Sequence, residues 1–169
     1  MNYLKWAFFI FLVFLAQTQF SAFRIMINLT TVLVYYFGLK SLPRESKLGG
    51  YFGGKAEIKS TAFGSAVGLL EDIISGSIIG PNFFSKGLTG FVSVMAFTEV
   101  VFKWTPLLGV IIVIILTVLD GVVVTGLRVI FTNININIID ALQTIFIQAI
   151  VNIPFGIIFK PSRFRLTDF

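Results

Sequence analysis

Six long apolar stretches occupy most of this 169-residue chain. A helix needs about 20 predominantly apolar residues to cross the hydrocarbon core of a membrane. The apolar residues here are continuous rather than alternating, which favours helices over a barrel. We therefore predict an all-α integral membrane protein, a six-transmembrane-helix bundle that forms a single polytopic domain over residues 1–169. The predicted spans are residues 4–20, 25–42, 60–79, 83–102, 106–131 and 138–159.

The composition limits the chemistry that the chain can perform. Hydrophobic residues make up 56% and charged residues only 12%, with a mean hydropathy of +0.94. A soluble domain carries about 25% charged residues. The chain contains no Cys and no His, so disulfides, thiolate chemistry and imidazole chemistry are excluded. We expect no metal, no cofactor and no nucleic-acid partner. We expect the protein to be surrounded mainly by membrane lipid.

The basic residues predict the orientation of the spans, because cytoplasmic loops of membrane proteins are enriched in Lys and Arg. With the N-terminus in the cytoplasm, only Arg24, Lys86 and Arg128 of the thirteen basic residues fall toward the outer side. Both chain ends are therefore predicted to be cytoplasmic. The main soluble feature is then the glycine-rich inner loop over residues 43–59. The basic residues on the predicted cytoplasmic side are Lys5, Lys40, Arg44, Lys47, Lys55, Lys59, Lys103, Lys160, Arg163 and Arg165.

The third stretch carries a small or acidic residue at every fourth position. Helical residues four apart lie above one another, so a second helix can approach closely along such a series. We call this series the small-residue ridge, and we predict either internal helix packing or a surface for a partner's transmembrane helix. Internal packing is favoured, because the acid within the ridge needs a partner inside the protein. The ridge consists of Ser60, Gly64, Gly68, Asp72, Gly76 and Gly80.

Charged side chains inside the apolar stretches predict a buried charge cluster. Glu71 and Asp72 are adjacent, and insertion scales penalise a charge at such a depth by about 3 kcal/mol. Lys86 opens the next stretch at a similar depth, and its long stem can reach inward. We predict that Lys86 pairs with either Asp72 or Glu71. Asp120 is expected to be an isolated membrane acid, buried as a packing group.

Two enzymatic patterns are present only in part. Gly49 to Lys55 approximates a phosphate-binding loop, but Ala56 stands where that loop needs Ser or Thr, and no strand precedes it. Asp72 and Asp120 suggest an intramembrane aspartyl pair. The residues before Asp120 lack the glycines of presenilin-type proteases, however, and the motifs of lipoprotein signal peptidases are absent. We therefore expect that the protein is not an enzyme.

Three glycine-rich motifs lie between residues 62 and 91. They read Gly64-x3-Gly68-Leu69-Leu70-x-Asp72, Ser75-Gly76-Ser77-x2-Gly80-x-Asn82 and Gly87-Leu88-x-Gly90-Phe91. With the chain length and the six predicted spans, they resemble the core of bacterial rod-shape-determining MreD proteins. Asn82, Gly87 and Gly90 are family-like residues of the turn and the fourth span. The chain departs from the family at Pro81, at Asn28 and in the longer inner loop.

The resemblance implies a non-catalytic scaffold subunit of the cell-elongation complex, which builds peptidoglycan in rod-shaped bacteria. It implies a place in the inner membrane and contact with MreC, and through MreC with MreB filaments, the RodA glycosyltransferase and the elongation transpeptidase. It also implies a fold similar to the substrate-binding subunits of energy-coupling-factor transporters. That likeness leaves an alternative open, the capture of a vitamin-type substrate in an outer polar pocket near Glu71, Asp72 and Lys86. The short outer loops argue against it.

Overall fold

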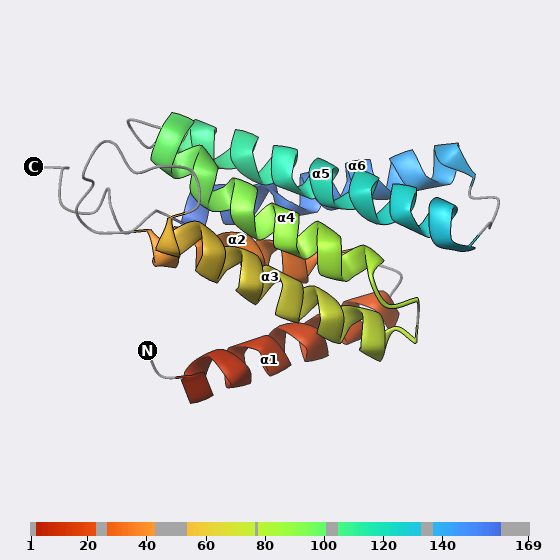
Figure 1. Cartoon of the computed structure of the whole chain (residues 1–169). Helices are drawn as coiled ribbons and strands as arrows, with labels where there is room; N and C mark the ends of the chain where they lie inside the picture. The colour runs from red at the N-terminus through yellow and green to blue at the C-terminus, as the bar shows by residue number, and fades with distance from the viewer. Residues whose placement is uncertain are drawn as a thin grey trace, which may run out of the picture.

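The computed structural model describes residues 3–22, 27–42, 54–76, 78–100, 105–132 and 137–159. All regular secondary structure in these segments is helical, so the predicted all-α class is confirmed for the described part of the chain. Figure 1 shows the helices as an elongated bundle with α1 along one edge. The helices are α1 (Tyr3–Ala22), α2 (Leu29–Ser41), α3 (Lys55–Ile74), α4 (Pro81–Met95) with a π-helical continuation (Ala96–Val100), α5 (Pro106–Thr132) and α6 (Ile138–Ile158).

The third helix ends earlier, and the fourth helix begins earlier, than the sequence predicts. We expected the third span to continue to residue 79, but α3 ends at Ile74. Gly76 follows with a φ of 62° and Gly80 with a φ of 137°. Both values favour glycine, and a left-handed residue after the last turn is a common way to end a helix. α4 then begins with Pro81 at its first position, where a missing N–H costs nothing.

The second helix begins with a side-chain cap. Asn28 precedes α2, and its side-chain oxygen accepts a hydrogen bond from the backbone N–H of Thr31 at 3.1 Å. Such a cap satisfies a donor that the first turn of a helix leaves unpaired. The predicted start at residue 25 and most of the predicted loop, residues 43–53, lie outside the described residues. α3 itself begins at Lys55, within the range predicted as loop.

The core is organised around α2. Its buried residues Tyr35 and Leu39 pack with Val94 and Phe97 of α4 and its continuation, and with Leu116 of α5. The other side of α2 packs against α1 and α3, and there the ring of Phe37 stacks on that of Phe63 with centroids 3.8 Å apart. Trp6 of α1 meets both rings edge-on. α2 is therefore covered on several sides, whereas α1 contacts the bundle through one face.

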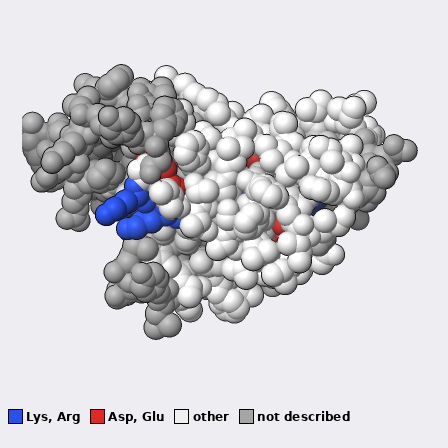
Figure 2. Space-filling view, viewed as in Figure 1, with Lys and Arg blue, Asp and Glu red and all other residues white. Residues whose placement is uncertain are grey.

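The two ends of the bundle differ in charge. The exposed Lys40, Lys55 and Lys59 lie where α2 ends and α3 begins, and we call this the basic end. Figure 2 shows a blue patch at this end and little charge elsewhere on the visible face. α1 begins and α6 ends at the same end in Figure 1. The opposite end carries the α3–α4 turn, the end of α5 and the start of α6.

Much of the described surface is hydrocarbon. Pro106–Phe131 and Ile138–Ile158 are long and apolar enough to cross a membrane. Many large apolar side chains on these helices are exposed, among them Leu107, Ile130 and Phe146. Water-soluble folds rarely leave contiguous apolar patches of this kind uncovered. Within the described residues, two of the six predicted spans thus meet the length and composition of a membrane-spanning helix.

Candidate functional site

A fully buried lysine is the centre of the polar interior. Lys86 projects from α4, and its Nζ lies 2.5 Å from Asp120 Oδ2 and 3.6 Å from Glu71 Oε2. The same Nζ donates to Thr31 Oγ1 at 3.0 Å and to Asn28 Oδ1 at 3.2 Å. We call Lys86, Asp120 and Glu71 the charge cluster. It joins α4 to α5 and α3, and its hydrogen bonds extend to the start of α2.

Asp120 is not isolated, so that part of the sequence prediction is wrong. Besides Lys86, its Oδ2 accepts hydrogen bonds from Asn28 Nδ2 at 2.6 Å and from Thr31 Oγ1 at 2.7 Å. Its Oδ1 accepts from Ser85 Oγ at 2.5 Å. The sequence could not show this pairing, because Lys86 and Asp120 come from different helices and meet only through the packing of α4 on α5.

Glu71 connects the charge cluster to the edge helix α1. Its Oε2 accepts a hydrogen bond from Thr30 Oγ1 at 2.7 Å, and its Oε1 accepts from Gln17 Nε2 at 3.2 Å. The side-chain oxygen Oε1 of Gln17 in turn accepts from the backbone N–H of Thr30 at 3.2 Å. Gln17 thus links α1 to both α2 and α3 through hydrogen bonds.

Of the two partners predicted for Lys86, Glu71 is confirmed by the 3.6 Å contact, whereas Asp72 caps α4 instead. Its Oδ2 accepts from the backbone N–H groups of Gly80 at 2.8 Å and Phe83 at 3.2 Å. Its Oδ1 accepts from the backbone N–H and the side-chain amide of Asn82, at 3.2 and 2.8 Å. A carboxylate is stabilised at a helix N-terminus, where unpaired N–H groups point outward. Asp72 therefore locks α3 to the start of α4.

The first four members of the small-residue ridge are buried within α3. The two glycines among them face the backbone of α4. A Cβ added at Gly64 would overlap the carbonyl oxygen of Lys86, and one added at Gly68 would overlap that of Asn82. The α3–α4 contact is the most extensive between any two described helices. This part of the ridge thus packs inside the protein.

The remaining family-like glycines lie in two settings. Gly76 and Gly80 fall beyond the end of α3, so the predicted ridge stops at Asp72. On α4, a Cβ at Gly90 would overlap the carbonyl oxygen of Ser60, and a Cβ at Gly87 would overlap the hydroxyl of Ser65. Small residues on both helices therefore permit the close crossing. Ser60 Oγ is buried without a hydrogen-bond partner among the described residues.

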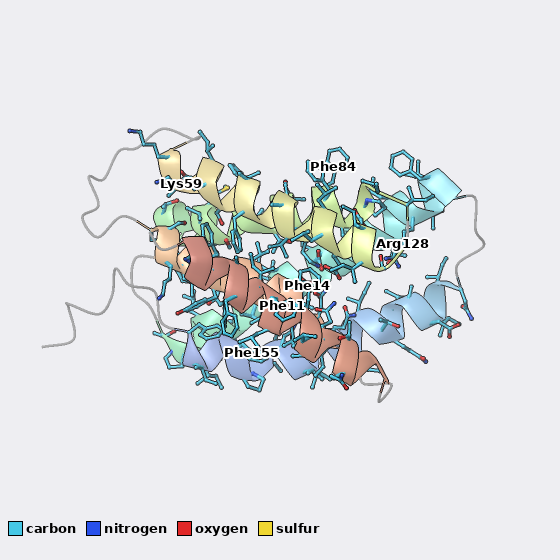
Figure 3. All side chains as sticks on the ribbon, turned by 90° about the horizontal axis from the view of Figure 1, so that it is seen from below. Phe11, Phe14, Lys59, Phe84, Arg128 and Phe155 are labelled. Carbon is cyan, nitrogen blue, oxygen red and sulfur yellow. The ribbon has the colours of Figure 1, made fainter. Side chains whose placement is uncertain are left out.

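A polar cleft of about 350 Å³ opens beside the charge cluster. Figure 3 shows Arg128, one of its lining residues, at the opposite end of the bundle from Lys59. The cleft therefore lies away from the basic end. It is contributed by the starts of α2 and α4, the end of α3, and facing turns of α5 and α6. The lining residues are Asn28, Glu71, Asn82, Asp120, Gly121, Val124, Thr125, Arg128, Asp140, Ala141, Thr144, Ile145 and Gln148.

Several residues of the site are missed by the sequence analysis. Asn28, Thr31 and Ser85 complete the hydrogen bonds of the charge cluster, and Arg128 and Asp140 line the cleft. The sequence does contain a signal for the first two, since Asn28, Thr30 and Thr31 interrupt an apolar stretch. Arg128 and Asp140 carry no comparable pattern. They come together because α5 and α6 pack antiparallel.

The acidic residues of the site accept hydrogen bonds mainly from the protein's own groups. Within the described segments, no three acidic side chains are placed to hold a metal ion together. The carboxylate oxygens of Asp120 and Asp72 already accept hydrogen bonds from donors within the protein. Comparisons of the chain with models of protein families, with curated proteins and with solved structures find no match.

Proposed function

We propose that the protein is a non-catalytic scaffold subunit of the bacterial cell-elongation complex and acts in the inner membrane through helix contacts with MreC. The observation that carries this proposal is the α3–α4 hairpin. The residues on which the MreD resemblance rests form one unit there: Gly64 and Gly68 allow the close crossing, and Asp72 caps α4 through Asn82. The motifs therefore act together in three dimensions, as expected of a family core.

Three features support a multi-pass membrane setting. α5 and α6 have the length and composition of membrane spans. On α1, the side chains of Phe8 and Phe11 are exposed on the surface of the bundle. The basic end would lie in the cytoplasm under the positive-inside rule. α1 begins and α6 ends at that end, in agreement with two cytoplasmic termini. As part of this proposal, we infer that the other four helices cross the membrane as well.

The scaffold role assigns partner contacts to the exposed helix faces. The charge cluster and the ridge are committed to internal contacts, so neither is available to a partner. A single transmembrane helix such as that of MreC could pack instead on the apolar faces of α1 or α6, where Phe8, Phe11 and Phe146 are exposed. MreB, RodA and the elongation transpeptidase would then be reached through MreC.

Purification of the tagged protein from native membranes in a mild detergent tests this proposal. The expected result is enrichment of MreC, with RodA or the wall transpeptidase, relative to the same purification from membranes of an untagged strain. A Phe8→Ser/Phe11→Ser variant should lose MreC if α1 is the contact, and an Ala66→Ser variant on α3 serves as the control. Recovery of none of these proteins from membranes that contain them would contradict the proposal.

A second function, substrate capture for a small-molecule transporter, is favoured by the polar cleft. The cleft lies at the end that would face outward, as a capture site requires, and the MreD resemblance implies a fold similar to that of vitamin-binding transporter subunits. The same purification distinguishes the two functions. Co-purification of paired ATPases with a coupling membrane subunit would support substrate capture and would reject the scaffold role.

A further inference from the structure

Every hydrogen of the Lys86 ammonium already has an acceptor. The group carries three N–H donors, and its Nζ lies 2.5 Å from Asp120 Oδ2, 3.0 Å from Thr31 Oγ1 and 3.2 Å from Asn28 Oδ1. Glu71 Oε2 is 3.6 Å from the same nitrogen, which is close enough for electrostatic attraction but too long for a hydrogen bond. Lys86 therefore supplies no hydrogen to Glu71.

The hydroxyl of Thr30 lies between two acceptors but has one hydrogen to donate. Its Oγ1 is 2.9 Å from Asn28 Oδ1 and 2.7 Å from Glu71 Oε2. Asn28 Oδ1 also accepts from the backbone N–H of Thr31 at 3.1 Å, so this atom is the amide oxygen and cannot donate. One of the two short oxygen–oxygen contacts of Thr30 therefore lacks a hydrogen when Glu71 is ionised.

The charge of the site favours the same missing hydrogen. With both carboxylates ionised, the charge cluster of Lys86, Asp120 and Glu71 carries one net negative charge. An uncompensated charge is costly in the low-dielectric interior of a membrane protein. Asp72, the neighbour of Glu71 on α3, is stabilised separately by backbone N–H groups at the start of α4.

The other groups around Glu71 leave this net charge in place. α1 and α2 contribute hydrogen bonds from the neutral side chains of Gln17 and Thr30. On the walls of the cleft, Arg128 of α5 and Asp140 of α6 have opposite signs and together add no net charge. One added proton would therefore neutralise the charge cluster and supply the missing hydrogen.

We propose that the charge cluster is a proton-binding site in which Glu71 carries a hydrogen on Oε2. The carboxyl O–H donates to Thr30 Oγ1, and the Thr30 hydroxyl then donates to Asn28 Oδ1, so that each short contact holds one hydrogen. Gln17 continues to donate to Glu71 Oε1. Because Glu71 lines the cleft, the proton arrives there as hydronium, which leaves as water. This inference does not depend on the scaffold role.

The bound proton connects the cleft to the start of α2, because Asn28 caps that helix. When the proton leaves, the hydrogen of Thr30 turns to the Glu71 carboxylate, and the bond from Thr30 to Asn28 is lost. Ionisable side chains inside membrane proteins often belong to proton relays. Here the relay begins at the cleft and ends at a helix cap.

Infrared spectroscopy of the purified full-length protein in detergent tests the proposal, because a protonated carboxyl and a carboxylate absorb at different frequencies. At neutral pH the native protein should show the C=O band of a protonated carboxyl, and folded Glu71→Gln should lack this band. Asp140→Asn in the cleft and Glu57→Gln at the basic end should retain it. Absence of the band from the native protein, or its persistence in Glu71→Gln, would overturn the proposal.

A second variant keeps the test independent of the folding of Glu71→Gln. Thr30→Val removes the acceptor of the proposed O–H but leaves the carboxyl in place, so the band should shift in frequency and not disappear. Transfer of the native protein into ²H₂O should also shift the band, because the cleft gives the proton access to solvent. A band that Thr30→Val leaves unchanged would overturn the assignment to the Glu71–Thr30 pair, and a band insensitive to deuterium would overturn access through the cleft.

Discussion

Lys86 links α4 to α2, α3 and α5 through contacts with four side chains. A buried ion pair adds little net stability, because both charges lose their hydration, but removal of one partner leaves the other charge buried and uncompensated. Lys86 faces two such partners, Asp120 at 2.5 Å and Glu71 at 3.6 Å. The stability of the bundle should therefore depend strongly on this one ammonium.

We predict that Lys86→Met destabilises the purified protein by about 3 to 5 kcal/mol, the usual cost of breaking a buried pair. Denaturant unfolding in detergent measures this loss. Lys59→Met, at an exposed position of α3, is the matched control and should change stability by less than about 0.5 kcal/mol. Addition of Asp120→Leu to Lys86→Met should restore part of the loss. Indistinguishable unfolding of Lys86→Met and the native protein would refute the structural role.

Asp72 is the second residue with a measurable role. Because its carboxylate accepts from three backbone N–H groups at the start of α4, we predict that Asp72→Ala costs about 1 to 2 kcal/mol, as for loss of a helix cap. Hydrogen exchange of these amides should accelerate most at Gly80 and Phe83. Glu57→Ala, an acid in the first turn of α3, should leave them unchanged. Unaltered protection in Asp72→Ala would contradict the capping role.

At the scale of the elements, the α3–α4 crossing depends on missing side chains. We predict that Gly68→Leu destabilises the protein and lowers its accumulation in membranes, because the new side chain would overlap the backbone of Asn82 and Phe83. Overpacking of this kind costs about 1 to 3 kcal/mol or more. Ala66→Leu, on the exposed side of the same helix, should be tolerated. Normal accumulation of Gly68→Leu with loss of one partner would instead place the ridge at an interface.

The sequence alone reveals part of this architecture. Spacing of four between small residues predicts a close crossing, and the structure supplies its partner, α4. The sequence does not reveal where α3 ends, because apolar residues recur at Ile78 and Ile79 although the backbone has already turned at Gly76. The nearest partner of Lys86 is hidden for a different reason. Charge and depth predict the pair with Glu71, which is present at 3.6 Å, but the register of α4 against α5 decides that Asp120 lies closer, at 2.5 Å.

At the scale of the whole molecule, the proposed orientation places the basic end in the cytoplasm and the cleft outside. The chain has no Cys, so a single introduced thiol reports one position. We predict that a membrane-impermeant maleimide labels Ile78→Cys, in the α3–α4 turn, in intact spheroplasts. Lys59→Cys should react only after permeabilisation. Labelling of Lys59→Cys from outside would contradict the proposed orientation and place the cleft on the cytoplasmic side.

The central claim, a role in cell elongation, is tested most directly by depletion of the protein in its native cells while cell width and shape are followed. The scaffold role predicts that cells widen and round up as the protein is lost, and that a Lys59→Gln copy restores rods whereas a Gly68→Leu copy does not. Growth that continues as rods of normal width after the protein is gone would contradict the claim.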